Sequence, residues 1–414
     1  MNGSNFQLVV SGIFILFLLG CVAAFALFSS GGGPGAAGMV EVWGPASRET
    51  FDKWLSALHQ SGNDSLDQVR YTEIPQASYE TTLVNAMAAG RGPDLFMVTD
   101  EQVISFADKI LTVPYSSYSQ GAFTSSFIDE ASLFLTAGGV RAFPIMVDPL
   151  VMYFNRDILA AAAVASPPQY WSDLLAVAPK ITSHDAGQTV RRSAVAMGTW
   201  RNVAYAKPLL ATLMLQAGEQ FVVRQEDGRL LSVLGASGGA ESPAASALRF
   251  YTEFANPQKT TYSWNASMPN STNAFLSGDV GLYFGFASDL PLLRARNPNL
   301  RFDVAMMPQL KAGSAATYGR LTGIAVSRGA KNPEGAAVAA KALSSRDAIS
   351  LLAGLSSLPP VRRDVVLDTS TSGEAGVFAR SALIARGWLD PKPASTDTIF
   401  KDMIESVLSG RSDP

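Results

Sequence analysis

The apolar run RAFPIMVDPLVMYFNRDIL, residues 141–159, is interrupted in its middle by one carboxylate, Asp148. The run predicts a buried β-strand that leads into the start of a helix. A carboxylate that is left unpaired inside such a run costs several kcal/mol. We therefore expect Asp148 to face a cleft, where it can meet both a ligand and solvent.

Two other patterns could support catalysis. Residues 235–239, GASGG, match the G-x-S-x-G nucleophile motif, which requires a helix after the serine and a later histidine. No histidine follows His184 and GGAESPAAS is turn-like, so a loop is the better interpretation. Asp100 and Asp148 in one cleft would also fit the paired carboxylates of a glycosidase, and this alternative stays open.

The composition excludes several classes of function. Charged residues make up 16% of the 414 residues and the net charge is -3, so no large basic surface is available for nucleic acid. The single cysteine, Cys21, excludes an internal disulfide, and two histidines make a histidine-rich metal centre improbable. We expect no metal, no cofactor and no nucleic-acid partner.

The N-terminal segment predicts a single membrane anchor. From Leu8 to Phe28 the chain carries no charge, and at about 1.5 Å per residue this length spans a hydrocarbon core of about 30 Å. The preceding MNGSNFQ lacks the basic residues of a signal peptide. The tetrapeptide ending in Cys21 resembles a lipoprotein box, although apolar residues follow it, so lipidation of Cys21 stays open. Residues 1–28 are therefore assigned to the anchor.

Residues 29–38, SSGGGPGAAG, form a glycine-rich linker. They contain the spacing G-x-G-x-x-G of dinucleotide-binding loops, but that motif needs a strand before it and a helix after it. Here the order is the apolar segment, the glycines and then an apolar strand, which indicates a flexible tether.

The body then alternates strands and helices. Helices are predicted at 47–61 and 78–90, with Ser47 and Ser78 as N-caps. Their order implies a parallel sheet with helices on both faces, and ligands of such sheets lie at the carboxyl ends of the strands. The first three strands are predicted at 39–44, 69–74 and 94–99.

A second α/β region begins near residue 152. Two strands follow its helices, and the second of them is expected to return to the first lobe. Two lobes joined by several crossings would leave a cleft for a small molecule. The helices are predicted at 170–181, 206–221 and 242–255, and the strands at 301–308 and 319–327.

Several segments, in this order, resemble extracellular solute-binding proteins of ABC importers, of the maltose and oligosaccharide-binding type. The resemblance covers nearly the whole body, although Gly281 and Leu282 depart from the usual small residue and Met of the family. The segments are YETTLVNAMAAGRGPDLFMVTD (79–100), AFPIMVDPLVMYFNRDIL (142–159), PPQYWSDLLAVAPKIT (167–182), AFLSGDVGLYFG (274–285), YGRLTGIAVSRGAKNPEGAAVAAKAL (318–343) and LPPVRRDV (358–365).

The resemblance implies an α/β fold of the periplasmic-binding-protein type II with a central cleft. Lobe 1 is expected at 39–147 with about 312–345, and lobe 2 at 148–311 with about 346–414. It also implies a carbohydrate ligand, because the acid of the interlobe segment, here Asp148, binds sugar hydroxyls in this family. Asp100 falls close to the sequence position at which the family has a second sugar-binding acid. Asn202 stands near a position where the family has an acid, and Ser288 near a position where it has a stacking aromatic ring, for which Phe286 can substitute.

Sugar hydroxyls both donate and accept hydrogen bonds, whereas aromatic faces cover the apolar C–H patches of a sugar. With Tyr318 as a further aromatic candidate, the predicted ligand-binding residues are Trp43, Asp100, Asp148, Trp200, Arg201, Asn202, Tyr205, Phe286, Ser288 and Arg320.

These observations predict a monomeric, non-enzymatic solute-binding protein anchored in the cell membrane, with its body on the extracellular or periplasmic side. Its two lobes would close on a mono- or oligosaccharide and deliver it to the permease subunits of an ABC transporter. A surface-bound sugar sensor or adhesion module without a transporter is the first alternative, and a glycosidase is the second.

Overall fold

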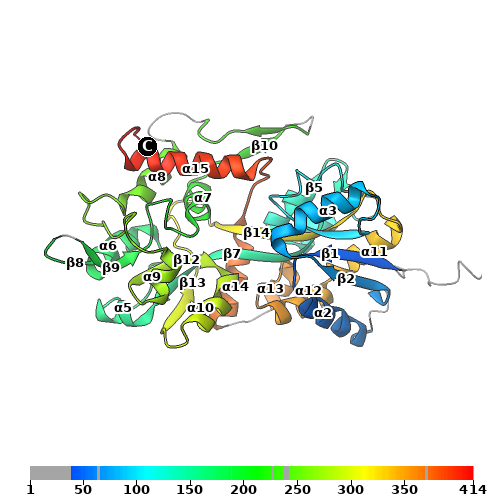
Figure 1. The fold of residues 1–414 in the computed structure, drawn as a ribbon, viewed down its shortest axis with the longest axis horizontal. Helices are drawn as coiled ribbons and strands as arrows, with labels where there is room; N and C mark the ends of the chain where they lie inside the picture. Colours follow the sequence, from blue (N-terminus) through cyan, green and yellow to red (C-terminus); the bar gives the residue numbers. More distant parts are fainter. Residues whose placement is uncertain are drawn as a thin grey trace, which may run out of the picture. The chain divides into compact units, whose positions relative to one another are not determined.

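The computed structural model describes residues 39–62, 66–187, 189–225, 228–236, 242–368 and 372–413. Strands and helices alternate along the chain (Figure 1), which divides into two compact units. The first unit holds the chain up to Leu95 together with Gly329–Ala342, and the second holds Phe96–Arg328 together with the chain from Leu343 onward. The lobe boundary expected between residues 147 and 148 separates two parts that are expected to move relative to one another when the solute binds, and it stays a prediction.

The predicted anchor at Leu8–Phe28 and the linker at residues 29–38 lie outside the described residues. Within the part of the chain that the structure describes, no helix has both the length and the apolar character needed to cross a membrane.

The first unit is built on two parallel strands, β1 and β2, as the strand and helix order predicts. The connecting helix α2 buries the apolar face of Phe51, Trp54 and Leu58. The elements of this unit are β1 (Val40–Gly44), α2 (Arg48–Gln60), β2 (Val69–Glu73), η2 (Gln76–Ser78), α3 (Tyr79–Ala88) and α11 (Pro333–Leu343).

Ser47 and Ser78 occupy the predicted N-cap positions of α2 and α3, but neither side chain accepts a hydrogen bond from its helix. The first free amide of α2, that of Arg48, donates instead to Glu73 Oε2 at 2.7 Å. The Ser78 hydroxyl donates backward to the carbonyl of Pro75 at 3.3 Å, since Ser78 ends a 3-10 turn. A tertiary acceptor and a local turn thus replace the two caps.

The second unit contains the remaining elements. Those before the long helix α7 are β3 (Leu95–Thr99), β4 (Val113–Pro114), α4 (Gln120–Ser126), η3 (Asp129–Phe134), β5 (Leu135–Thr136), β6 (Gly139–Val140), β7 (Phe143–Asn155), α5 (Arg156–Ala161), α6 (Trp171–Ile181), β8 (Ser183–His184) and β9 (Val190–Val195). The following elements are α7 (Ala206–Gln216), β10 (Val222–Arg224), β11 (Leu230–Ser232), α8 (Pro243–Glu253), α9 (Ser271–Leu276), β12 (Val280–Phe286), η4 (Ala287–Asp289), α10 (Leu290–Arg296), β13 (Phe302–Ala305), β14 (Thr317–Val326), α12 (Arg346–Ser356), α13 (Arg363–Asp368), α14 (Gly373–Leu383), β15 (Ala385–Arg386) and α15 (Pro393–Leu408).

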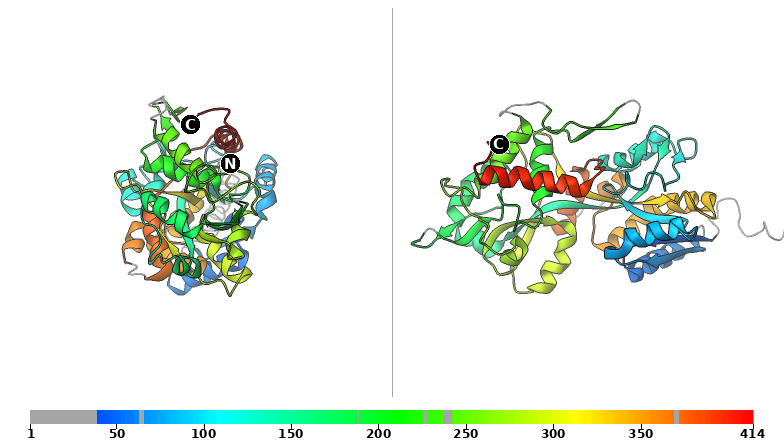
Figure 2. Two further views of the ribbon diagram at one scale, coloured as in Figure 1. Left: turned by 90° about the vertical axis from the view of Figure 1, so that its left-hand side faces the viewer. Right: turned by 45° about the horizontal axis from the view of Figure 1, so that its top comes forward.

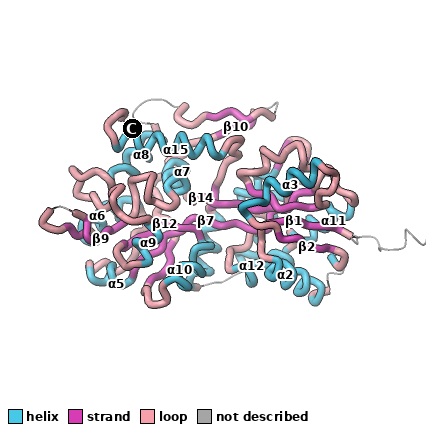
Figure 3. The backbone as a smooth tube through the Cα atoms, in the orientation of Figure 1, coloured by secondary structure: helices cyan, strands magenta, loops and turns pink. Residues whose placement is uncertain are grey.

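The sheet of the second unit runs in the order β3, β14, β7, β12, β9 and β8, with β13 also on β7 and β15 on β14. Figure 3 shows three of these strands, β14, β7 and β12, in magenta. β7 is antiparallel to β14, β12 and β13, whereas β12 and β9 are parallel. The expectation of a parallel sheet therefore does not extend to this unit, because strand and helix order along a chain does not fix the direction in which a returning strand enters.

The apolar core of the second unit surrounds β7 and β12. Every residue of β12 is buried, and the apolar faces of α6, α7 and α8 join the same cluster. The C-terminal helix α15 packs against α7 and α8 (Figures 1 and 2). Phe400 of α15 enters a stack with Phe221 and Trp388, whose ring centroids lie 4.1 Å apart. Burial of these large rings is the main stabilising term for such a contact.

Candidate functional site

The strand β7 changes its partner at the predicted site. Residues up to Pro149 pair with β14, and residues from Leu150 pair with β12. Asp148 is the last residue but one of the first stretch, and Arg320 of β14 lies directly opposite it. Most other side chains of β7 are buried, while Asp148 is partly exposed. The position thus allows a charged group in an otherwise apolar strand.

The carboxylate of Asp148 is bound by one residue, Ser288. The backbone N–H of Ser288 donates to Oδ1 at 3.0 Å, and its hydroxyl donates to Oδ2 at 2.6 Å. Burial raises the pKa of Asp148 to about 6, although these hydrogen bonds and the charge of Arg320 oppose the shift. The structure thus brings two predicted site residues together, with Asp148 holding the turn that follows β12.

A second carboxylate beside this turn, Asp289, was not foreseen. Tyr205 donates to its Oδ1 at 2.9 Å, and Tyr283 donates to its Oδ2 at 3.1 Å. Burial raises the pKa of Asp289, and the two tyrosine hydroxyls partly oppose this. The only sequence signal was its position directly after Ser288. Asp289 positions Tyr205, which is one of the predicted ligand-binding residues.

Arg320 lies against the aromatic rings of this site. Its guanidinium carbon lies 3.7 Å from the ring centroid of Phe286 and 5.5 Å from that of Tyr205. The two rings meet edge to face, with centroids 4.9 Å apart. Phe286 is fully buried, so its ring packs against the guanidinium of Arg320 and is not itself open to solvent. A cation over an aromatic face is electrostatically favourable.

A cavity of about 410 Å³ opens beside these groups. Four predicted residues line it: Trp200, Arg201, Tyr205 and Arg320. Tyr318, a further aromatic candidate, also lines it. Lining groups that sequence reasoning did not identify are Glu101, Val203, Ala204, Ala206, Lys207, Pro208, Asn270 and Asp397.

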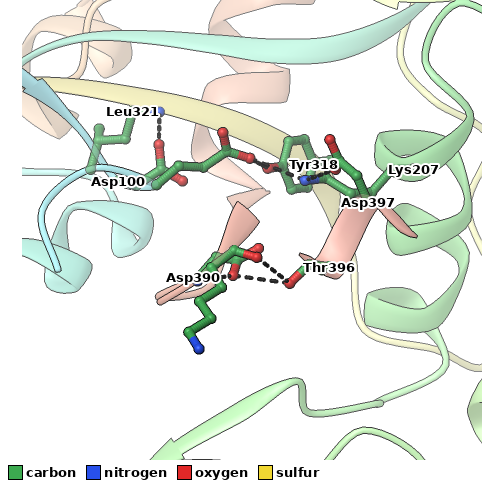
Figure 4. A network of polar contacts seen from close by, with 9 residues as sticks. Asp100, Lys207, Tyr318, Leu321, Asp390, Thr396 and Asp397 are labelled. Carbon is green, nitrogen blue, oxygen red and sulfur yellow. Dashed lines mark hydrogen bonds and ion pairs between the residues drawn. The ribbon is translucent and has the colours of Figure 1, made fainter. Parts of the chain in front are cut away.

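A buried lysine, Lys207, pairs with two acids that line the cavity (Figure 4). Lys207 Nζ lies 2.6 Å from Asp397 Oδ1 and 3.4 Å from Glu101 Oε1, and Tyr318 donates to the same Glu101 oxygen at 3.3 Å. Burial alone would lower the pKa of Lys207, but the hydrogen bond to Asp397 and the charge of Glu101 outweigh it and raise the pKa. Lys207 therefore stays charged and connects α7 to α15.

Asp100 is buried and is not among the residues that line the cavity. Its side chain is 1% exposed, and its Oδ1 accepts from the backbone N–H of Leu321 at 3.0 Å (Figure 4). Its Oδ2 and both oxygens of the buried Glu130 have no hydrogen-bond partner among the described residues. A methyl group added at Gly387 would lie 2.9 Å from Glu130 Oε1 and 3.1 Å from Asp100 Oδ2, so the two acids face one spot.

This geometry favours a protonated acid pair. Burial raises the pKa of Asp100 to about 7 and that of Glu130 well above its ordinary value. The charge of Asp100 raises the pKa of Glu130 further, and the charge of Glu101 does the same for Asp100. The prediction that Asp100 contacts a ligand is therefore not supported by its position, which sequence could not reveal.

Asn202, another predicted residue, uses its side-chain amide for hydrogen bonds within the protein. Asn202 donates to the carbonyls of Asn265 and Met268 at 2.9 and 2.8 Å, and its Oδ1 accepts from Thr199 and Trp264. It is 7% exposed and does not line the cavity, so it holds the loop that carries Trp200 and Arg201.

Trp43, the remaining predicted residue, belongs to the first unit. Its indole N–H donates to Glu41 Oε1 at 2.6 Å, and its ring is partly exposed on β1. Its role in ligand binding stays a prediction. Within the described ranges, no group of three or more His, Cys, Asp or Glu side chains could hold a metal ion.

Comparison with models of known protein families identifies one family for this chain. Residues 60–379 match the family model described as bacterial extracellular solute-binding protein. A curated binding protein of Brucella abortus is 23% identical over 258 residues, which cover 61% of this chain and 58% of that protein. The match thus spans less than two thirds of the relative's length.

Solved structures of sugar-binding proteins share the fold. The cyclic alpha-maltosyl-1,6-maltose binding protein from Arthrobacter globiformis has a TM-score of 0.74 at 17% identity, covering 90% of this chain and 94% of its own. The sugar-binding protein MalE from Xanthomonas citri has a TM-score of 0.70 at 16% identity, covering 91% and 93%. A cyclo/maltodextrin-binding protein complexed with maltotetraose has a TM-score of 0.69 at 17% identity, covering 93% and 95%. At these identities the likeness establishes the fold alone.

Proposed function

The chain belongs to the bacterial extracellular solute-binding protein family, and from this premise we propose that its solute is a carbohydrate, which it delivers to the permease of an ABC importer. Members of this family bind solutes and are not enzymes, so hydrolysis of the bound solute is not part of the proposal. The fold is shared with proteins whose names state that they bind maltodextrins and other sugars.

The observation that carries the proposal is the composition of the cavity wall. Aromatic side chains, Trp200 and Tyr205, stand beside Arg201, Arg320 and Glu101 around about 410 Å³. This combination suits a sugar, because aromatic faces cover its C–H patches while charged groups exchange hydrogen bonds with its hydroxyls.

Closure of two lobes on the solute is part of the proposal. The cavity takes residues from both predicted lobes: Glu101 and Arg320 fall in lobe 1 (39–147 with about 312–345), whereas Trp200 and Asp397 fall in lobe 2 (148–311 with about 346–414). A solute that contacts both sets would favour the closed arrangement, as in hinge-bending binding proteins.

The membrane anchor at Leu8–Phe28 is likewise proposed, on the sequence alone. A tether of this kind would keep the binding protein beside the permease and raise its effective concentration there. Lipidation of Cys21 is a second way to the same result, and the mass of the mature N-terminus distinguishes the two.

Isothermal titration of the purified chain tests the proposal. The panel contains maltose, maltotetraose, other neutral oligosaccharides, uronic acids, sugar phosphates, amino acids and polyamines. We expect at least one saccharide to bind with a single site, and Trp200→Ala to weaken that binding at least tenfold through loss of a stacking surface. Binding of amino acids or polyamines with no saccharide bound would contradict the carbohydrate assignment.

A further inference from the structure

We propose that the solute carries an anionic group, a carboxylate or a phosphate on the sugar, and that Arg320 with Arg201 binds it. This inference rests on the proposed carbohydrate function and names the class of saccharide. It follows from which polar groups at the cavity are already engaged and which are not.

The carboxylates at the site already receive hydrogen bonds from the protein itself. Asp148 accepts both available donors of Ser288, and Asp289 accepts from two tyrosines. On the cavity wall, Asp397 and Glu101 share the ammonium group of Lys207. The acids are thus occupied by internal donors, and their remaining capacity to accept from a sugar is reduced.

The two guanidinium groups on the cavity wall are in the opposite situation. Neither the Arg320 nor the Arg201 side chain makes a hydrogen bond or an ion pair with any residue that the structure describes, and both residues are exposed and line the cavity. Each guanidinium has five N–H donors. The site therefore offers many unused donors and few unused acceptors, and an anionic acceptor group matches this imbalance.

Arg320 is held in place without using its donors. Its guanidinium rests 3.7 Å above the centroid of Phe286, which is fixed in β12, and Tyr205 flanks it at 5.5 Å. A planar guanidinium with its fork free is suited to bidentate recognition of a carboxylate or phosphate. Because the rings limit its rotamers, less entropy is lost when it binds.

The charges on the cavity wall agree with this assignment. The wall carries three cations, Arg201, Lys207 and Arg320, and two anions, Glu101 and Asp397. Both anions pair with Lys207. The charge of Arg320 also acts on Asp148 and Asp289, which balances part of it, but neither acid is within ion-pair distance of Arg320. An anionic group of the solute would pair with Arg320 and Arg201, the two cations of the wall that have no acidic partner among its described residues.

The test is a titration of matched saccharide pairs at 50 mM and at 500 mM NaCl. One pair is digalacturonate with digalactose, and the other is glucose 6-phosphate with glucose, so that the two arms distinguish a carboxylate from a phosphate. We expect one acidic member to bind at least tenfold more tightly than its neutral partner at low salt. The preference should decrease at high salt, since charge pairing at an open site is screened.

Variants of Arg320 test whether this residue causes the preference for the acidic saccharide. Arg320→Gln should reduce the tenfold preference to less than threefold, because it weakens binding of the acidic member more than binding of the neutral partner. Arg320→Lys retains the charge but loses the planar guanidinium. Its preference for the acidic saccharide should lie between that of the unmodified chain and that of Arg320→Gln. Arg296→Gln is the matched control, because Arg296 is an exposed arginine of α10 outside the cavity wall, and it should leave the preference unchanged.

The outcomes separate the two proposals. Equal binding of both members of each pair, or a preference for the neutral member, would overturn the anionic solute and leave the carbohydrate function standing. A preference that survives in Arg320→Gln and in Arg201→Gln would overturn the assigned residues. If no saccharide bound at all, the carbohydrate function itself would be wrong, and the anionic saccharide with it.

Discussion

Carboxyl groups in the second unit differ in whether hydrogen-bond donors meet their oxygens. Asp148 and Asp289 accept from nearby hydroxyls and a backbone amide, and so position the turn and the aromatic ring beside the cavity. Asp100 and Glu130 lack such donors at three of their four oxygens. Donors to a carboxylate favour its ionised form, whereas buried oxygens without a donor favour the protonated form.

The bond between Asp148 and Ser288 gives the first prediction. Asp148→Ala should lower the free energy of unfolding by about 0.5–1.5 kcal/mol, because it removes both hydrogen bonds from Ser288, whose exposed donors can then bind water. Ser288→Ala should cost less, since the backbone N–H still reaches Oδ1. Urea unfolding of both variants and the double variant measures this, and fully additive costs would contradict a direct interaction.

The pair of Asp100 and Glu130 predicts a pH dependence of stability. Their pKa values are raised in the folded state, to about 7 for Asp100, so the folded protein holds protons that the unfolded chain releases. The contribution of the pair is therefore fully present below about pH 4, the ordinary pKa of a carboxyl group, and is lost as the pH rises through about 7.

Glu130→Gln should make this decline smaller, since it removes one titrating group and keeps the shape of the side chain. Urea unfolding at pH 5 and pH 8 measures the difference. Glu334→Gln, an exposed position at the start of α11, is the matched control and should follow the unmodified chain. An identical decline in all three proteins would show that titration of Glu130 does not contribute to the pH dependence of stability.

Strand β7 and helix α15 join elements of the second unit that lie far apart in the chain. Strand β7 extends through both stretches of the sheet, pairing first with β14 and then with β12. Helix α15, at the end of the chain, is attached to α7 through Lys207 and Asp397 and through the buried ring of Phe400. The C-terminal helix therefore contributes directly to the cavity wall.

Loss of the lysine should loosen this helix. Lys207→Met leaves Glu101 and Asp397 without their cation, and we expect a loss of about 1–3 kcal/mol, below the cost for a fully buried pair because Asp397 is half exposed. Hydrogen exchange of the α15 amides should increase. Lys401→Met, an exposed lysine on the same helix, should change neither quantity, and equal effects of the two variants would assign no specific role to Lys207.

The whole molecule is expected to respond to its solute by movement of the two predicted lobes. A solute bound to residues of both lobes stabilises the arrangement in which all contacts form. Small-angle X-ray scattering should therefore record a smaller radius of gyration when a saturating saccharide is added. The same addition to Arg320→Gln, at a concentration that no longer saturates it, should give a smaller change. An unchanged radius at saturation would contradict closure.

Much of the architecture was predictable from local patterns. The periodicity of apolar residues predicted the helices near 48–60, 171–181 and 243–253 and the strands of β1, β2 and β14 within a few residues, since burial of one face imposes that pattern on any chain that folds this way. The resemblance of several short segments, taken in order, predicted the family to which the chain belongs.

The sequence by itself determined which side chains are available for binding: an acid within an apolar strand, arginines and aromatic residues near predicted turns. Only the tertiary structure decided which of them meet. It placed Asp148 against Ser288, buried Asp100 beside Glu130, engaged Asn202 within its loop and left Arg320 with free donors above Phe286. The physical reason is that burial and hydrogen bonding depend on contacts between residues far apart in the chain, which no local pattern specifies.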